Sequence, residues 1–212
     1  RSVYCDSKNR IWAGSDGWGI SMIENNKIKN YNNNHGLSHN RAISINEWNG
    51  KIWVGTYGGG LCYFENDSFY KINKLPVYDL ISSINTTNDR QLLINTSGGG
   101  LQILDEFNIT TINQKNGLSN DILLASCKDK HGNIWIGSYG GGISKIINSP
   151  FVSYNEKSNL QGYIAKAFLT TEDHLLISVS GQGLLTIKND SVYQFSNKQG
   201  LPNNYILALQ KI

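Results

Sequence analysis

Aromatic and polar side chains stand beside recurring glycine clusters in this chain, and their types suit the recognition of sugars. Trp18, Tyr57 and Tyr139 each adjoin a glycine of such a cluster. Aromatic faces stack on the apolar faces of sugar rings, and amides, carboxylates and guanidiniums bond to sugar hydroxyls. Groups of the second kind occur at Asp16, Arg41, Asn120, Asp121 and Asn203, and Tyr205 supplies a further ring with a hydroxyl. We predict these nine residues as a ligand-binding set; the alternative is that the aromatic rings cap hairpins or pack between sheets.

Residues suited to catalysis or metal binding form no recognisable pattern. The carboxylate pairs Asp105-Glu106 and Glu172-Asp173 both fall in turn-like sequence, where solvated side chains are the simpler interpretation. Four scattered histidines complete no Ser/His/Asp order and no metal-ligand spacing. The three cysteines, Cys5, Cys62 and Cys127, have no paired spacing and are expected to be isolated thiols. We therefore predict no catalytic residues, no metal and no cofactor.

The glycine clusters belong to a block that occurs five times: an apolar pair, a small residue, two polar or aromatic residues, then glycines. Its central Trp or Leu recurs at intervals of 41, 40, 42 and 41 residues. The blocks are 11–19, 52–60, 92–100, 134–142 and 175–183. A repeat of about 40–45 residues made of short strands is typical of propeller blades.

The fourth repeat shows how one blade is built. Apolar or alternating runs at 122–128, 134–137, 142–147 and 151–154 are separated by turn residues, and none has a sustained helical period. Four antiparallel strands joined by tight hairpins make one blade. We predict an all-β fold, a single β-propeller segment of about five four-stranded blades. The expected repeats are 1–40, 41–79, 80–121, 122–162 and 163–204, with the first strand of a sixth at 205–212.

The recurring residues of the block have structural explanations. Trp12, Trp53 and Trp135, with Leu93 and Leu176 at equivalent positions, are expected to pack between blades, because large aromatics dominate such cores. The glycines permit positive φ in the hairpin and close approach between blades. A phosphate-binding loop is not indicated, since a strand and not a helix follows each cluster.

Composition excludes several classes of protein. Of 212 residues, 17% are charged, 22 are glycine and 3 are proline, which suits many strands joined by glycine turns. The net charge of +3 comes without any basic run, so we expect no nucleic-acid binding. No apolar run is long enough for a membrane helix, and no signal peptide is present. Because both ends lie inside the repeat pattern, we expect this to be a segment of a longer protein.

A second recurring motif lies between repeats, and with the first it points to a family. Gly-Leu-Ser/Pro-x-Asn/Asp stands at Gly36–Asn40, Gly117–Asp121 and Gly200–Asn204, with degenerate versions at 74–77 and 159–162. Followed by a strand and by Asp-x-x-Gly-Asn-Ile-Trp-Ile-Gly, as at 129–137, this combination resembles the two-component regulator propeller repeat. The resemblance covers nearly the whole chain. Leu93, Leu176 and Gln182 depart from the pattern and weaken packing there.

The resemblance implies a periplasmic sensor region of a hybrid two-component histidine kinase of the Bacteroidetes. Such regulators carry two tandem seven-bladed propellers, so five repeats would be part of one. They typically detect oligosaccharides and switch on genes of polysaccharide use. The implied partners are an oligosaccharide or other small ligand, the rest of the same receptor chain, and a second copy in a homodimer. On this interpretation the segment itself is not an enzyme.

The blade topology predicts where a ligand would sit. In a four-stranded blade, the hairpin between the second and third strands and the connection to the next blade emerge at the same edge. The glycine clusters and the Gly-Leu-Ser linkers should therefore meet, and the variable residues there would set specificity. Two alternatives remain open: a protein-interaction scaffold with no small ligand, and a propeller enzyme such as a lyase acting on a carbohydrate or cyclic peptide.

Overall fold

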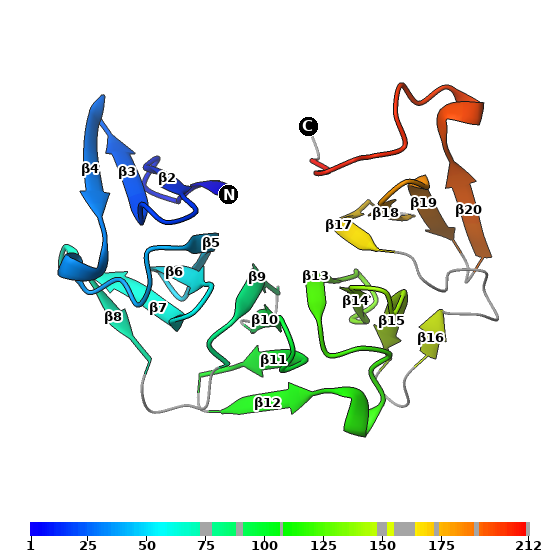
Figure 1. Ribbon diagram of the computed structural model, residues 1–212, viewed down its shortest axis with the longest axis horizontal. Coiled ribbons are helices and arrows are strands. Elements are labelled where there is room, and N and C mark those ends of the chain that lie inside the picture. Colours follow the sequence, from blue (N-terminus) through cyan, green and yellow to red (C-terminus); the bar gives the residue numbers. More distant parts are fainter. Residues whose placement is uncertain are drawn as a thin grey trace. The chain divides into compact units, whose positions relative to one another are not determined.

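The computed structural model is all-β and contains five four-stranded antiparallel sheets (Figure 1). It describes residues 1–72, 78–87, 91–106, 108–147, 152–154, 164–171, 174–188 and 191–210. Within each sheet the strands pair in chain order, β1-β2-β3-β4 being the first sheet and β17-β18-β19-β20 the fifth. This arrangement is that of propeller blades and confirms the predicted fold class. We refer to the sheets as sheets 1 to 5 in chain order.

The strands of sheets 1 to 3 are β1 (Ser2–Cys5), β2 (Ile11–Gly14), β3 (Ile20–Glu24), β4 (Lys27–Tyr31), β5 (Ala42–Trp48), β6 (Lys51–Thr56), β7 (Gly60–Glu65), β8 (Ser68–Lys71), β9 (Ile81–Thr86), β10 (Leu92–Thr96), β11 (Leu101–Leu104) and β12 (Ile109–Ile112). The later strands are β13 (Leu123–Lys128), β14 (Ile134–Ser138), β15 (Ile143–Ile146), β16 (Val152–Tyr154), β17 (Ala165–Thr170), β18 (Leu175–Val179), β19 (Gly183–Lys188) and β20 (Ser191–Phe195). The described residues also form the single-turn 3-10 helices η1 (Asn33–His35), η2 (Gln114–Asn116) and η4 (Asn197–Gln199).

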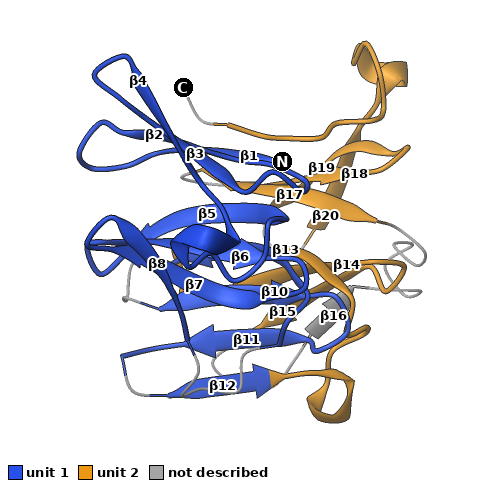
Figure 2. Ribbon diagram, turned by 60° about the vertical axis from the view of Figure 1, so that its left-hand side comes forward, with its two compact units in different colours: residues 1–111 blue, residues 112–212 orange. Residues whose placement is uncertain are grey.

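The chain divides into two compact units, coloured separately in Figure 2. Unit 1 is Arg1–Thr111 and holds sheets 1 to 3; unit 2 is Ile112–Ile212 and holds sheets 4 and 5. The predicted repeat boundaries stay a prediction. Residues 205–210, expected to be the first strand of a sixth repeat, are not in a strand. A first strand pairs only with the second strand of its own sheet, and these residues have no such partner in the described chain.

Tight turns join the strands because asparagine and glycine accept positive φ. Asn25 and Asn26 between β3 and β4 have φ of 48° and 60°, and Asn49 and Gly50 between β5 and β6 have 49° and 70°. Two consecutive residues of this kind make the turn whose twist matches an antiparallel pair. The strands pair directly beside such a turn, as Glu24 does with Lys27. Local sequence therefore sets the register of each hairpin.

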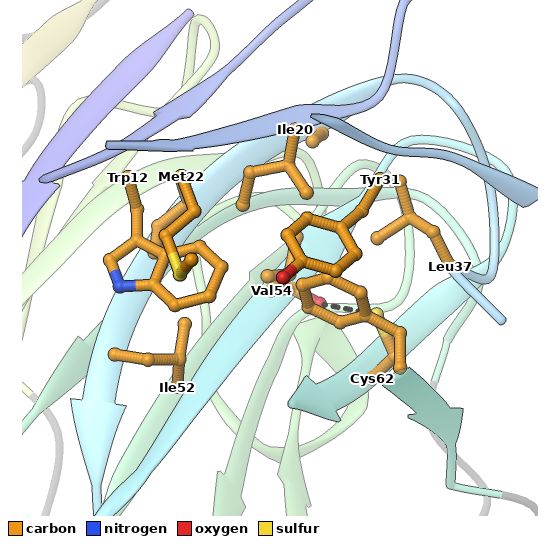
Figure 3. Packing of buried hydrophobic residues seen from close by; sticks show 11 residues of the cluster. Trp12, Ile20, Met22, Tyr31, Leu37, Ile52, Val54 and Cys62 are labelled. Carbon is orange, nitrogen blue, oxygen red and sulfur yellow. Dashed lines mark hydrogen bonds between the residues drawn. The ribbon is translucent and has the colours of Figure 1, made fainter. Parts of the chain in front are cut away.

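A hydrophobic core fills the space between sheets 1 and 2 (Figure 3). Trp12 on β2 is fully buried and meets the ring of Phe64 on β7 edge-on, at 4.9 Å between centroids. Figure 3 shows Trp12 and Met22 facing Ile52 across this core, and the thiol of Cys62 donating to the carbonyl of Val54 at 3.7 Å. Each sheet thus buries one face against its neighbour.

Equivalent cores lie between sheets 2 and 3 and between sheets 4 and 5. Trp53 packs with Ile81 and Ile84 in the first, and Trp135 packs with Leu175 and other residues of β17–β19 in the second. The prediction that the repeated tryptophans pack between blades is confirmed. At the two departures from the pattern, Leu93 is fully buried and Leu176 is only partly buried.

The glycine two residues after each repeated tryptophan lies where neighbouring sheets approach closely. A Cβ at Gly55 would lie 2.6 Å from Ile81 Cγ2, and one at Gly137 would lie 2.6 Å from Ala165 Cβ. Neither distance leaves room for a side chain. The hairpin glycine Gly59 allows a different close approach, because a Cβ there would lie 2.4 Å from the carbonyl oxygen of Ser38 in the preceding linker.

Each described linker with the Gly-Leu-Ser/Pro motif is a 3-10 turn ended by glycine. Asn32 caps η1, Asn113 caps η2 and Ser196 caps η4, each by accepting a backbone N–H with its side chain. Gly36 then takes a φ of 82°, and the leucine that follows, Leu37, is buried. The degenerate linkers at 74–77 and 159–162 lie outside the described residues.

Candidate functional site

The glycine hairpins and the linkers meet, as the topology predicts. We use "glycine hairpin" for the connection between the second and third strands of a sheet. In sheet 1, the amides of Gly17 and Gly19 donate to the carbonyl of Asn40, at 3.2 and 2.8 Å. In sheet 2, the amides of Gly58 and Gly60 donate to the carbonyl of Asp79, at 2.9 and 3.0 Å. One linker carbonyl thus holds two hairpin amides in each case.

The sheet 1 hairpin reaches the first strand of sheet 2 through a charged pair. Asp16 and Arg41 form an isolated antiparallel bridge, and Arg41 Nε donates to Asp16 Oδ1 at 2.6 Å. Arg1 Nε donates to the other carboxylate oxygen, Oδ2, at 3.0 Å. These hydrogen bonds, that from Arg1 first and that from Arg41 second, hold the pKa of Asp16 below its ordinary value. Asp16 is therefore a carboxylate shared by two guanidiniums.

Arg41 also lies over an aromatic ring from the sheet 2 hairpin. Its Cζ is 4.8 Å from the centroid of Tyr57, a cation–π distance. The Tyr57 amide donates to the carbonyl of Arg41 at 3.0 Å, so backbone and side chain are fixed together. The structure thus brings three of the predicted residues, Asp16, Arg41 and Tyr57, into one contiguous cluster.

Trp18 stands out of the sheet 1 hairpin into solvent. Its side chain is 89% exposed, whereas those of the other four tryptophans are at most 7% exposed. The hairpin under it is held by the two glycine bonds to Asn40 and by the Trp18 amide, which donates to Ser15 Oγ at 2.9 Å. The alternative that this ring packs between sheets does not hold for Trp18. An exposed indole on a fixed backbone is available for stacking.

In unit 2, Tyr139 is half-exposed on the sheet 4 hairpin, and the neighbouring linker residues are occupied by structural bonds. Asn120 Nδ2 donates to the Tyr139 carbonyl at 2.9 Å, and its Oδ1 accepts from the amide of Ile122 at 2.8 Å. Asp121 Oδ1 accepts from the amide of Gln114 at 2.7 Å, which ties the linker to η2. The recurrence of these polar residues therefore has a structural cause.

Asn203 and Tyr205 show the same division of roles. Asn203 Oδ1 accepts from the Tyr205 amide at 2.9 Å, the bond that Asn120 makes to Ile122. Tyr205 is 67% exposed, and its hydroxyl lies beside the glycine hairpin of sheet 5 at Gly181. In unit 2 the predicted residues thus separate into exposed rings and polar side chains with structural bonds, and the binding role of the whole set stays a prediction.

Sequence reasoning missed two carboxylates that hold the core tryptophans, one buried (Asp6) and one partly buried (Asp129). Asp6 Oδ2 accepts from Trp12 Nε1 at 2.8 Å and from Arg10 Nε at 2.7 Å, and Asp129 Oδ2 accepts from Trp135 Nε1 at 2.8 Å. Burial opposes ionisation of both carboxylates, yet the hydrogen bonds outweigh it and the pKa of each is lowered. The sequence signal for this role is an aspartate six residues before the tryptophan in both repeats.

The remaining candidates for chemistry lie apart from the hairpins. Asp105 Oδ1 accepts from the amide of Asn108 at 2.7 Å, as expected for a turn, and Glu172-Asp173 lies outside the described residues. Among the described residues, no group of three His, Cys, Asp or Glu side chains is placed to hold a metal ion. The described helices include none that is long and apolar enough to cross a membrane.

Residues 116–140 match the family described as "Two component regulator propeller". These residues include the second linker, β13 and β14, the elements on which the resemblance was based. The match confirms that resemblance for this part of the chain. No curated protein matches the chain.

Solved structures with the same architecture include two from B. thetaiotaomicron. The extracellular domain of the hybrid two component system BT3049 has a TM-score of 0.80 at 23% identity, covering 96% of this chain and 29% of that one. The extracellular domain of BT4673, described as a one component system, has a TM-score of 0.74 at 23% identity, covering 91% and 30%. This chain thus spans less than a third of either protein.

An enzyme shares the fold as well. Virginiamycin B lyase from Staphylococcus aureus has a TM-score of 0.71 at 16% identity, covering 91% of this chain and 68% of the lyase. At these identities the likeness shows the propeller fold alone, so function must be argued from the residues of this chain.

Proposed function

We propose that this chain is part of an extracytoplasmic sensor propeller that binds an oligosaccharide on the glycine-hairpin face of sheets 1 and 2. The observation that carries the proposal is the cluster of Asp16, Arg41 and Tyr57, with the exposed ring of Trp18 on the same hairpin as Asp16. It combines an exposed ring with a carboxylate and a guanidinium on a backbone held by paired hydrogen bonds. Rings and charged donors and acceptors in fixed positions are what a sugar requires.

The match at 116–140 and the likeness to the extracellular domains of a hybrid two component system and of a one component system support the sensor part of this proposal. On this view the parent protein is a periplasm-facing receptor, and the segment itself is not an enzyme. Ligand binding would signal by differential affinity for two states of a receptor dimer.

The lyase-like alternative rests on the shared fold. It requires an acid or base free to act at the hairpin face. The histidine there, His39, uses Nδ1 to accept the Arg41 amide at 3.1 Å, and its ring lies against Gly58. This arrangement favours a structural role for His39 and so favours the sensor.

Calorimetric titration of the full chain with a panel of oligosaccharides tests the proposal. We expect one member to bind, and we expect Trp18→Ala to weaken that binding by about tenfold, since stacking on an aromatic ring contributes on the order of 1–2 kcal/mol. Tyr70→Ala is the matched control, because Tyr70 is a 43% exposed ring on β8, outside the hairpin face. Equal losses in both variants, or unchanged binding in Trp18→Ala, would refute the proposed site.

A further inference from the structure

The hairpin face of unit 1 carries more positive than negative charge. The charged side chains there are Arg1, Arg41 and Asp16, two guanidiniums on one carboxylate. The other charged pair near this face has no net charge, because Lys71 Nζ lies 3.3 Å from Asp79 Oδ1, next to the sheet 2 hairpin. One positive charge is therefore uncompensated.

The side chain of Arg41 is held in place and still has hydrogen-bond donors available for a ligand. Its Nε is committed to Asp16, and its guanidinium plane is supported by the ring of Tyr57. In the part of the chain that the structure describes, neither terminal nitrogen of Arg41 makes a hydrogen bond. These nitrogens form the fork that binds carboxylate or sulfate through two parallel bonds. The Arg41 side chain is 41% exposed, so a ligand can reach it.

The exposed ring of Trp18 lies on the same hairpin as Asp16. Gly17 and Gly19 on either side of it are both bonded to Asn40, the residue directly before Arg41. A ring for stacking and a fork for an anion thus stand on adjacent, hydrogen-bonded segments. A neutral sugar would use the ring but leave the surplus charge unmatched.

We propose that the hairpin face of unit 1 binds an acidic sugar, one that bears a carboxylate or a sulfate, with the anion on Arg41 and the sugar ring on Trp18. This inference rests on the proposed function and names its ligand class. Arg1 shares the carboxylate of Asp16, so an arriving anion meets one uncompensated positive charge and neutralises it.

Titration with two matched pairs of probes tests the inference. The first pair is trigalacturonate and its methyl ester, and the second is a sulfated galacto-oligosaccharide and its desulfated form. We expect binding of at least one acidic member and at least about tenfold weaker binding of its neutral partner, the loss expected when a charged hydrogen bond is removed. The affinity should fall as salt rises, because the charges are exposed. The pair that responds distinguishes carboxylate from sulfate.

Three variants test whether the preference for the acidic probe depends on Arg41 and Asp16. Arg41→Met should weaken the acidic probe by about tenfold, and Asp16→Asn should strengthen it, because the competing carboxylate is removed. Lys51→Met is the matched control: Lys51 also lies over a tyrosine, Tyr63, and pairs with Glu65, but at the other end of sheet 2. It removes the same charge and should leave binding unchanged.

A ligand-free measurement gives a second test. Trp18 is the only strongly exposed tryptophan, so quenching of its fluorescence by iodide and by caesium reports the local charge. The ratio of iodide to caesium quenching should fall in Arg41→Met, rise in Asp16→Asn and stay unchanged in Lys51→Met.

The outcomes separate this inference from the proposed function. Equal binding of acidic and neutral partners, lost in Trp18→Ala, would overturn the acidic ligand and leave the sensor site standing. Binding of none of the four probes, or a quenching ratio unaffected by Arg41→Met, would also overturn the inference.

Discussion

Replacing Gly55 by alanine tests the close approach between sheets 2 and 3. The new Cβ would lie 2.6 Å from Ile81 Cγ2 and 3.2 Å from Ile84 Cγ2, and both isoleucines are buried on strand β9. Overpacking of this kind lowers the free energy of unfolding by about 1–3 kcal/mol. Alanine also reduces the conformational entropy of the unfolded chain, which offsets about 0.4–1 kcal/mol of this loss. We expect a net loss of about 1–2 kcal/mol in the free energy of unfolding.

Thermal and chemical denaturation of the full chain measure this loss. For a chain of this size, it corresponds to a fall of about 2–8 °C in the melting temperature. The specific cause is tested by combining Gly55→Ala with Ile81→Ala, which removes the atom that the new Cβ would meet. In that background Gly55→Ala should cost nothing or stabilise the protein, because it fills part of the space that Ile81→Ala leaves.

The comparison with Gly14 sharpens the test. A Cβ at Gly14 would lie 2.6 Å from the carbonyl oxygen of Ala42, a backbone atom that no side-chain truncation can remove. Gly14→Ala should therefore destabilise the protein, and no side-chain truncation in the neighbouring sheet should restore the lost stability. An equal cost of Gly55→Ala with and without Ile81→Ala would refute the steric explanation.

Further predictions concern the carboxylates, the core and the exposed ring. Because the pKa of Asp6 and that of Asp129 are lowered by folding, their stabilisation is complete above the unfolded value of about 3.9 and is lost as the pH falls through the folded values. Stability measured from pH 7 to pH 3 should fall less steeply in a variant with both replaced by asparagine, and an unchanged slope would contradict this. Trp135→Phe keeps an aromatic ring but removes a donor from Asp129, so denaturant titration should show a loss of about 1–3 kcal/mol, and wild-type stability would count against that bond. Asp121→Ala should lower the free energy of unfolding by about 1 kcal/mol, because it removes the hydrogen bond from the Gln114 amide of η2. Trp18→Ala should change the free energy of unfolding by less than about 0.5 kcal/mol. A melt in which Trp18→Ala is the more damaging of the two would reverse the assigned roles.

The fold could be predicted because its signals are local and repeated. Trp12, Trp53 and Trp135 recur at blade spacing beside β-branched residues, and each is followed by glycines with positive φ. Such patterns specify strands and hairpins without knowledge of the partner sheet. The meeting of hairpin and linker followed from topology alone.

Other features depend on contacts that a single sequence does not display. The 3-10 helices are three residues long, which is too short to show a periodic hydrophobic pattern in the sequence. Their sequence signals are N-cap residues such as Asn32 and Asn113. The role of Gly55 depends on the path of β9. Spacing placed Trp18 near a glycine cluster, but its exposure and the position of Arg41 over Tyr57 required three-dimensional neighbours.

The central claim is that ligand binds on the hairpin face of unit 1, and hydrogen–deuterium exchange with and without a bound oligosaccharide tests it most directly. The account predicts that bound ligand slows exchange in residues 15–19 and 38–42, which carry Trp18 and Arg41, and that this protection is weaker in Arg41→Met at the same ligand concentration. Protection confined to the outer strands β4 and β8, with residues 15–19 unchanged, would contradict it.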